Sequence, residues 1–172
     1  MIKRAQEKQD PIAEDVIWSI FTQVAIGLNE CHNHKKGKIL HRDLKPQNIF
    51  VTESHQIKIG DFGLSKQLDQ NDDGTLTNVG TPYYMSPELV DQIEYNDKSD
   101  VWSLGAIVYE LCMLEPLFKS DGIFQLSRKI KEGKTQRISA TFSDELDRVI
   151  NLMLEVRHEK RPSINELLKT VP

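Results

Sequence analysis

The chain has 172 residues, of which 38% are hydrophobic and 28% charged, and its formal net charge is -4 at pH 7. This length suits one compact domain, and the mild acidity speaks against nucleic acid or an anionic membrane surface as a partner. No apolar stretch is long enough to cross a bilayer, and the polar first ten residues lack the apolar core of a signal peptide. These features predict a soluble intracellular protein without repeats.

The first predicted helix begins at Asp10, because an aspartate N-cap followed by Pro11 is a common helix start. Apolar residues then recur at the helical period from Ile12 to Leu28, so one side of a helix of about six turns should pack against a core. The next two apolar runs are short, at 49–51 and 57–59, and are separated by five mostly polar residues. Their length and spacing predict a small antiparallel hairpin.

The second half of the chain predicts further helices. Residues 69–77 are polar and should form a surface loop, whereas residues 101–114 are apolar on nearly every face and should form a helix buried in the domain centre. Ser163 and Glu166 form a capping box for the last helix. Three amphipathic helices are expected at 123–132, 144–154 and 164–169.

Cysteines and histidines give no sign of a metal site. Cys31 and Cys112 both lie among apolar neighbours, so two buried, reduced thiols are expected in place of a disulfide or a metal centre. The spacing of four histidines is unlike that of metal ligands, and these residues are expected to be ordinary surface or loop residues. They are His32, His34, His55 and His158.

Two polar motifs flank the predicted hairpin. The sequence His-Arg-Asp-Leu-Lys-Pro-Gln-Asn at 41–48 precedes its first strand, and Asp-Phe-Gly at 61–63 follows its second strand. A hairpin brings its two outer ends together, so both motifs should meet at one edge of the domain. Phosphoryl transfer needs oxygen ligands for magnesium, a carboxylate facing the attacking hydroxyl and a cation near the developing charge, and these motifs contain each of them.

Both motifs resemble the signature of protein kinases, and the resemblance covers essentially the whole chain. Residues 80–88, Gly-Thr-Pro-Tyr-Tyr-Met-Ser-Pro-Glu, resemble the end of a kinase activation loop, and residues 98–105 resemble the start of the central helix. Arg161 resembles the late arginine of kinases that pairs with Glu88. The chain is therefore similar to the large, C-terminal lobe of eukaryotic serine/threonine protein kinases.

Three segments narrow this resemblance to the NIMA-related kinase family. They are residues 60–64, 80–88 and 95–100. Family resemblance implies an intracellular, cytoplasmic protein, with the centrosome, the cilium or the nucleus as further locations.

The resemblance also implies a role for each matching residue of the site. Asp43 would be the base that orients the substrate hydroxyl, Lys45 would contact the transferred phosphoryl group, and Thr81 would bond Asp43. The cofactors would be ATP and Mg²⁺. Asn48 and Asp61 would ligate the metal, and Phe50 would form the floor under the adenine.

Three further residues are expected to regulate the site. Arg42 and Lys66 are cations that would face a phosphorylated Thr77, the threonine whose distance before residues 80–82 resembles that of the family's activating threonine. The alternative is an unmodified, solvated polar loop. Asp100 also has two readings, as a plain helix N-cap or, by family resemblance, as an acceptor for the backbone near His41 and Arg42.

A complete kinase also has a small lobe with a Gly-rich loop, a strand lysine and a hinge, and no Gly-x-Gly-x-x-Gly occurs in this sequence. Residues 1–172 are therefore expected to be the C-terminal lobe only of a kinase catalytic domain: mostly α, with a small β-hairpin at the catalytic edge and the small lobe absent. The chain would be a fragment, a short isoform or a protein that lacks this lobe.

Two functions remain open at this point. One is ATP-dependent phosphorylation of serine or threonine on protein substrates, by the catalytic half of a kinase that works with an upstream small lobe or a regulatory protein. The other is an inactive docking or competitor module. The intact residues Asp43, Asn48 and Asp61 favour the first function, and the missing small lobe favours the second.

Overall fold

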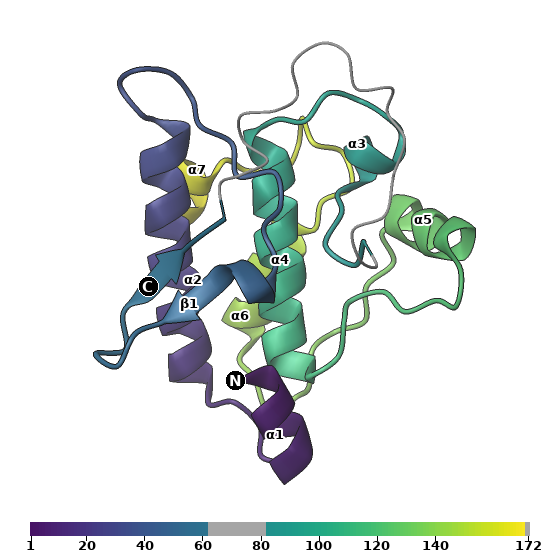
Figure 1. Cartoon of the computed structure of the whole chain (residues 1–172). Helices are drawn as coiled ribbons and strands as arrows, with labels where there is room; N and C mark the ends of the chain where they lie inside the picture. Colours follow the sequence, from purple (N-terminus) through teal and green to yellow (C-terminus); the bar gives the residue numbers. More distant parts are fainter. Residues whose placement is uncertain (62–81, 171–172) are drawn as a thin grey trace.

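Helices are the main secondary structure of the computed structural model, which describes residues 1–61 and 82–170 (Figure 1). Strands β1 (Ile49–Val51) and β2 (Ile57–Ile59) form an antiparallel hairpin at the predicted positions. The helices are α1 (Ile2–Lys8), α2 (Glu14–His32), α3 (Pro87–Val90), α4 (Asp97–Met113), α5 (Ile123–Glu132), α6 (Asp144–Met153) and α7 (Ile164–Leu168), with a 3-10 turn, η1, at Pro46–Asn48. The prediction of a mostly α domain with one small hairpin is confirmed; the short helices α1 and α3 were not predicted.

Helix α4 is the centre of the domain, as its apolar sequence predicted. Every residue from Ser99 to Cys112 is buried, because α2 and α6 both pack against this helix (Figure 1). The ring of Trp102 stacks on Phe118 with centroids 6.4 Å apart. Although α4 is apolar on all sides, none of the helices in the described ranges is long and apolar enough to cross a membrane.

The start of α4 differs from the prediction. The helix begins at Asp97, four residues before the apolar run, and the Asn96 side chain accepts a hydrogen bond from the backbone N–H of Lys98. The Ser99 hydroxyl accepts the Asn96 N–H in return, which completes a capping box. The first turn, residues 97–100, is polar, so the apolar pattern did not predict it as part of the helix. Asp100 lies inside the helix, so its interpretation as the N-cap is wrong.

The start of α2 also differs from the prediction. Helix α2 begins at Glu14, with Ala13 at the N-cap position, whereas Asp10 lies at the end of α1, where its amide donates to the carbonyl of Ala5. Gln9 has the left-handed conformation that this type of helix end requires (φ 52°). Asp10 therefore belongs to the connection between two helices, and its interpretation as an N-cap is wrong.

The two cysteines are free thiols within the described ranges. Cys112 is buried as predicted, and burial raises the pKa of its thiol to about 12. Cys31 is only half-buried, so the prediction of full burial is wrong for this residue.

The hairpin lies against α2, and its register decides which side chains face the core. Ile49 pairs with Ile59 and Val51 pairs with Ile57, so these four apolar side chains share one face. Phe50 pairs with Lys58 on the opposite face. The hairpin is fixed to α2 because the side-chain oxygen of Gln23 accepts the backbone N–H of Ile57 at 2.9 Å.

Two helical glycines give a matched test of the packing. A Cβ atom at Gly105 of α4 would lie 2.7 Å from the Cβ of Met153, which the backbone of α6 holds in place. Gly105→Ala should therefore lower the free energy of unfolding by about 1–3 kcal/mol, measured by urea denaturation. At Gly27 of α2 the added atom would meet only the flexible end of Ile59, at 2.9 Å.

Gly27→Ala is the control for this experiment. Because alanine has the higher helix propensity, by about 1 kcal/mol, this variant should be as stable as the parent or more stable. If both variants lose the same free energy of unfolding, the conclusion that α4 and α6 pack too closely at Gly105 to admit a side chain is wrong.

Candidate active site

Asp43, Lys45 and Asn48 lie together at the end of the hairpin, as the sequence predicted. The Nζ of Lys45 lies 2.5 Å from the Oδ2 of Asp43, and the Nδ2 of Asn48 donates to the same oxygen at 3.1 Å. Asn48 also donates to the backbone carbonyl of Asp43 at 2.8 Å. The carboxylate of Asp43 is therefore fixed on one side by two donors, and its side chain stays about a quarter exposed, at 26%.

The hairpin delivers Asp61 to the same place. The backbone N–H of Gly60, the residue before it, donates to the carbonyl of Asn48 at 2.9 Å, and the ring Nε2 of His41 lies 3.0 Å from the carbonyl oxygen of Gly60. Residue 60 is a glycine for a steric reason: a Cβ atom there would lie 2.7 Å from the ring of Phe50. Asp61 follows in a left-handed conformation (φ 61°) with its side chain exposed.

Asn48 and Asp61 have the oxygen atoms that a magnesium ion prefers. Asn48 uses its Nδ2 for both of its side-chain hydrogen bonds, which leaves its Oδ1 free to ligate a cation. The carboxylate of Asp61 has no hydrogen bond or ion pair within the described part of the chain. The residues present therefore fit the Mg²⁺ that the sequence predicted.

Asp100 holds the backbone of the loop that carries Asp43. Its Oδ2 accepts the N–H of His41 at 3.0 Å, and its Oδ1 accepts the N–H of Arg42 at 3.1 Å. The hydroxyl of Tyr95 donates to Asp100 as well. These bonds hold Arg42 in a left-handed conformation (φ 69°) that a side chain rarely adopts. The contact between Asp100 and this backbone is thus confirmed.

His32 was missed by the sequence analysis, which expected a surface residue. It is buried at the end of α2, and its Nε2 donates to the Oδ2 of Asp100 at 2.7 Å. The usable signal was its position four residues after Leu28, on the buried stripe of the helix. His34 and His55 are exposed and His158 is half-buried, which agrees with the expectation for these three.

Glu88 and Arg161 form the buried ion pair that the family resemblance implied. The guanidinium donates to both carboxylate oxygens, at 2.8 and 3.1 Å, and the Ser99 hydroxyl donates to the same carboxylate at 2.6 Å. Burial alone would raise the pKa of Glu88, but the bonds from Arg161 and Ser99 outweigh this effect and hold the pKa below its usual value. This pair ties residues 86–90 to the C-terminal part of the domain.

Tyr84 and Glu110 form a second polar pair that the sequence analysis did not single out. The hydroxyl of Tyr84 donates to the Oε2 of Glu110 at 2.6 Å. Burial raises the pKa of Glu110 despite this bond, and burial together with Glu110 raises the pKa of Tyr84. The available signal was an acidic residue inside an otherwise apolar helix.

Three predicted residues cannot be compared with the structure. Lys66, Thr77 and Thr81 lie outside the described residues. Arg42 is described: it is half-buried, and its Nε has no hydrogen-bond partner within residues 1–61 and 82–170.

Asp43, held by a lysine and an amide before the first strand, and Asp61, after the second strand, lie at the same open end of the hairpin. Carboxylates, an amide and a lysine gathered in this way suit enzymatic phosphoryl transfer. The sequence matches the family described as "Protein kinase domain" over residues 1–171, and the chain belongs to this family. Within the family, it is similar to NIMA-related kinases, as the motifs at 60–64 and 80–88 had indicated.

Three relatives define this similarity. "Probable serine/threonine-protein kinase nek2" of Dictyostelium discoideum is 45% identical over 98% of this chain and 40% of the relative's own length. "Serine/threonine-protein kinase Nek2" of Homo sapiens is 42% identical over 98% of the chain and 38% of the relative. "G2-specific protein kinase fin1" of Schizosaccharomyces pombe is 38% identical over 99% of the chain and 26% of the relative. The chain thus spans 40% or less of the length of these relatives.

Removal of Arg161 should show how much the buried pair stabilises the fold. Arg161→Met leaves Glu88 as a buried charge without its cation, and the free energy of unfolding should fall by about 3–5 kcal/mol at pH 7 in urea denaturation. The pKa of Glu88 is lowered on folding, so its contribution is complete above its usual pKa of 4.5 and is lost as the pH falls through the folded value. The difference between variant and parent should therefore shrink below pH 4.5.

Arg157→Met is the matched control, since this arginine is exposed beside Glu155 and its loss should change stability by less than about 0.5 kcal/mol. A difference between Arg161→Met and the parent that stays constant down to pH 3 would contradict the role assigned to Glu88.

Proposed function

We propose that this chain forms the catalytic-loop and substrate-binding half of a serine/threonine protein kinase. The reaction is transfer of the terminal phosphoryl group of ATP to a serine or threonine hydroxyl on a protein. The observation that carries the proposal is the carboxylate of Asp43, which Lys45 and Asn48 hold at the end of the hairpin that also carries Asp61.

We infer a different role for each side-chain oxygen of Asp43 and for the ammonium of Lys45. The Oδ2 of Asp43 is used by Lys45 and Asn48, whereas its Oδ1 makes no hydrogen bond within the described ranges and is free to accept the substrate hydroxyl. Accepting this hydrogen bond orients the hydroxyl oxygen for attack and gives its proton an acceptor. The ammonium of Lys45 offsets the negative charge where the carboxylate and the phosphoryl group approach each other.

Asn48 and Asp61 would hold Mg²⁺, through the Oδ1 of the amide and the free carboxylate. The bound ion neutralises the charge that develops on the phosphate oxygens. Phe50 lies on the face of the hairpin away from the core with its ring packed over Gly60, and its 55% exposure leaves an apolar surface for the adenine.

The substrate class follows from the cleft beside Asp43. This cleft has a volume of about 440 Å³, and its lining includes Arg42, Asp43, Lys45 and residues 82–85. Aromatic and apolar side chains line it beside the charged groups, and we infer that it accepts a polypeptide segment. The relatives, which are named as serine/threonine-protein kinases, support the same choice.

The domain assignment is part of this proposal: residues 1–172 correspond to the large lobe, and catalysis requires a small lobe that covers the nucleotide. Its support is the exposed ring of Phe50 and the 40% or lower coverage of the relatives. Without the groups that position the phosphates, most of the catalytic advantage in phosphoryl transfer is lost. A docking module is the alternative that the same test distinguishes.

Catalysis is tested on the chain fused to the small lobe of a related kinase, by transfer of labelled phosphate from ATP to a generic protein substrate. We expect activity in the fusion and negligible activity in residues 1–172 alone. Asp43→Asn should lower the turnover of the fusion by roughly 10²- to 10⁴-fold, the range for a positioned proton-transfer group. Asp61→Ala should abolish the Mg²⁺-dependent reaction.

Circular dichroism must show that each variant keeps the parent's helix content. Lys58→Ala is the control for the hairpin, because Lys58 is exposed on the strand that precedes Asp61 but forms no ion pair within the described ranges. A folded fusion without activity would overturn the enzymatic proposal and leave the docking module. Activity that survives both aspartate substitutions would overturn the assignment of roles.

Regulation by phosphorylation of Thr77 is also proposed. Arg42 is half-buried, and its Nε has no hydrogen-bond partner in the described residues, so it can donate to a phosphate group. Together with Lys66 it would bind the phosphorylated side chain and order the segment around it. Thr77→Ala should lower the activity of the fusion severalfold, and mass spectrometry of the active protein should find phosphate on Thr77. An unmodified, fully active Thr77→Ala protein would contradict this.

A further inference from the structure

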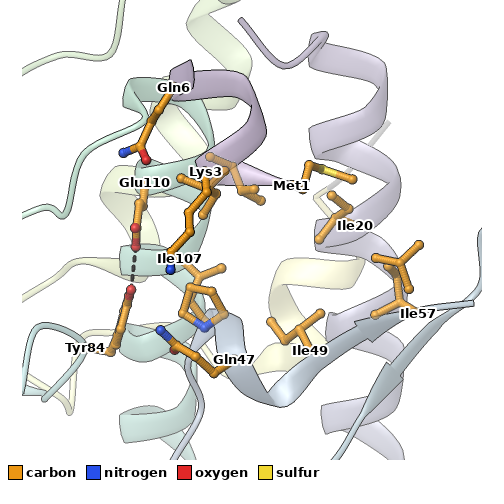
Figure 2. A pocket seen from close by; sticks show the side chains of 14 residues that line it. Met1, Lys3, Gln6, Ile20, Gln47, Ile49, Ile57, Tyr84, Ile107 and Glu110 are labelled. Atoms are coloured by element: carbon orange, nitrogen blue, oxygen red, sulfur yellow. Dashed lines mark hydrogen bonds between the residues drawn. The ribbon is translucent and has the colours of Figure 1, made fainter. Parts of the chain in front are cut away.

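A cavity of about 340 Å³ lies on the face of the hairpin that carries Ile49, Val51 and Ile57, between α1, α2 and α4 (Figure 2). Its walls are mainly branched aliphatic side chains from four elements of the fold: Ile20, Ile49, Val51, Ile57, Ile107 and Leu111. This volume is at the lower end of the range for small-molecule sites, and an apolar wall with a few polar groups is their usual lining.

Glu110 gives this apolar cavity a defined polar end. Its side chain is more than nine-tenths buried, at 8% exposure, yet within the described ranges the Tyr84 hydroxyl is its one hydrogen-bond partner, on Oε2. Oε1 is left without a donor, and no lysine, arginine or histidine of those ranges forms an ion pair with this carboxylate. A buried carboxylate that lacks a cation is costly, and its raised pKa reflects this cost. A ligand that brings a donor would relieve it.

Figure 2 shows how the polar and apolar ends are separated. The Tyr84–Glu110 pair lies at one end of the cavity, and Ile49 and Ile57 lie at the other end. The side chain of Lys3 extends from α1 toward the polar end in this view. Lys3 is exposed and forms no ion pair with Glu110, so a ligand cation would compete with this ammonium for the carboxylate.

We propose that this cavity binds a small amphipathic amine, whose apolar body lies among the isoleucines and whose ammonium group donates to the free Oε1 of Glu110. The apolar body replaces cavity space with contacts. The ammonium supplies the donor and the positive charge that the buried carboxylate lacks.

This site is separate from the nucleotide surface, although the two share the hairpin. Ile49, Val51 and Ile57 face the cavity, whereas Phe50 is on the opposite face of the same strand pair. The proposed ligand therefore does not depend on ATP or on the kinase reaction, and its binding is measured without nucleotide.

The test uses residues 1–172 with isoleucine methyl groups labelled for NMR, and phenylbutylamine as the probe. Phenylbutanol and phenylbutyrate are the matched probes, with a neutral and an anionic head on the same apolar body. Phenylbutylamine should shift the methyl signals of Ile20, Ile49, Ile57 and Ile107, and leave Ile123 on the distant α5 unchanged. It should bind about tenfold more tightly than phenylbutanol, because its hydrogen bond is made between charged groups.

Three variants locate the site. Glu110→Gln should remove the preference for the amine over the alcohol, and Val51→Trp should fill the cavity and abolish the methyl shifts for all probes. Ile26→Trp is the control, since Ile26 is 50% exposed on α2 and does not line the cavity. The proposal is overturned if adding the amine to the parent protein does not shift the methyl signals of the isoleucines that line the cavity. It is equally overturned if amine and alcohol bind the parent with the same affinity.

Discussion

The geometry of the site depends on the hydrogen bonds that the buried carboxylate of Asp100 accepts from the loop before Asp43. This carboxylate has no solvent exposure, and a charge in that position is tolerated only when donors surround it. The backbone amides of His41 and Arg42, the hydroxyl of Tyr95 and the ring of His32 supply these donors. Because Asp100 is in the first turn of α4, the loop that carries the candidate base is attached to the buried central helix of the domain.

Three acidic side chains around α4 differ in how fully they are paired. Asp100 and Glu88 are each surrounded by several donors, and they join segments that are far apart in the sequence. Glu110 has one donor within the described ranges and borders a cavity. Carboxylates whose oxygens all have donors stabilise the fold, whereas a carboxylate with an unpaired oxygen can gain a hydrogen bond from a ligand. The opposite directions of the pKa changes of Glu88 and Glu110 express this difference.

The sequence predicted those parts of the fold that repeat a period or match a motif. The bounds of the hairpin and of α5 follow from apolar spacing and from Gly133, which ends α5 in a left-handed conformation. The predicted start of α2 was wrong because α1 and its left-handed end at Gln9 occupy the preceding residues, and α2 begins only after Ala13. The predicted start of α4 was wrong because the side chain of Asn96, and not the apolar run, caps this helix. For His32 and Glu110 a local pattern indicated burial, but their partners, Asp100 and Tyr84, lie more than twenty residues away, and a local pattern does not identify them.

Ser99 has two functions in one hydroxyl group. Its oxygen accepts the N–H of Asn96 at the start of α4, and its proton goes to the carboxylate of Glu88. The first turn of the central helix and the buried ion pair therefore share an atom, so fraying of that turn withdraws a donor from Glu88. Helix ends usually open independently of the rest of a protein. Here the start of α4 is linked through Ser99 and Glu88 to Arg161, so we expect its amide hydrogens to exchange with solvent more slowly than those of an ordinary helix end.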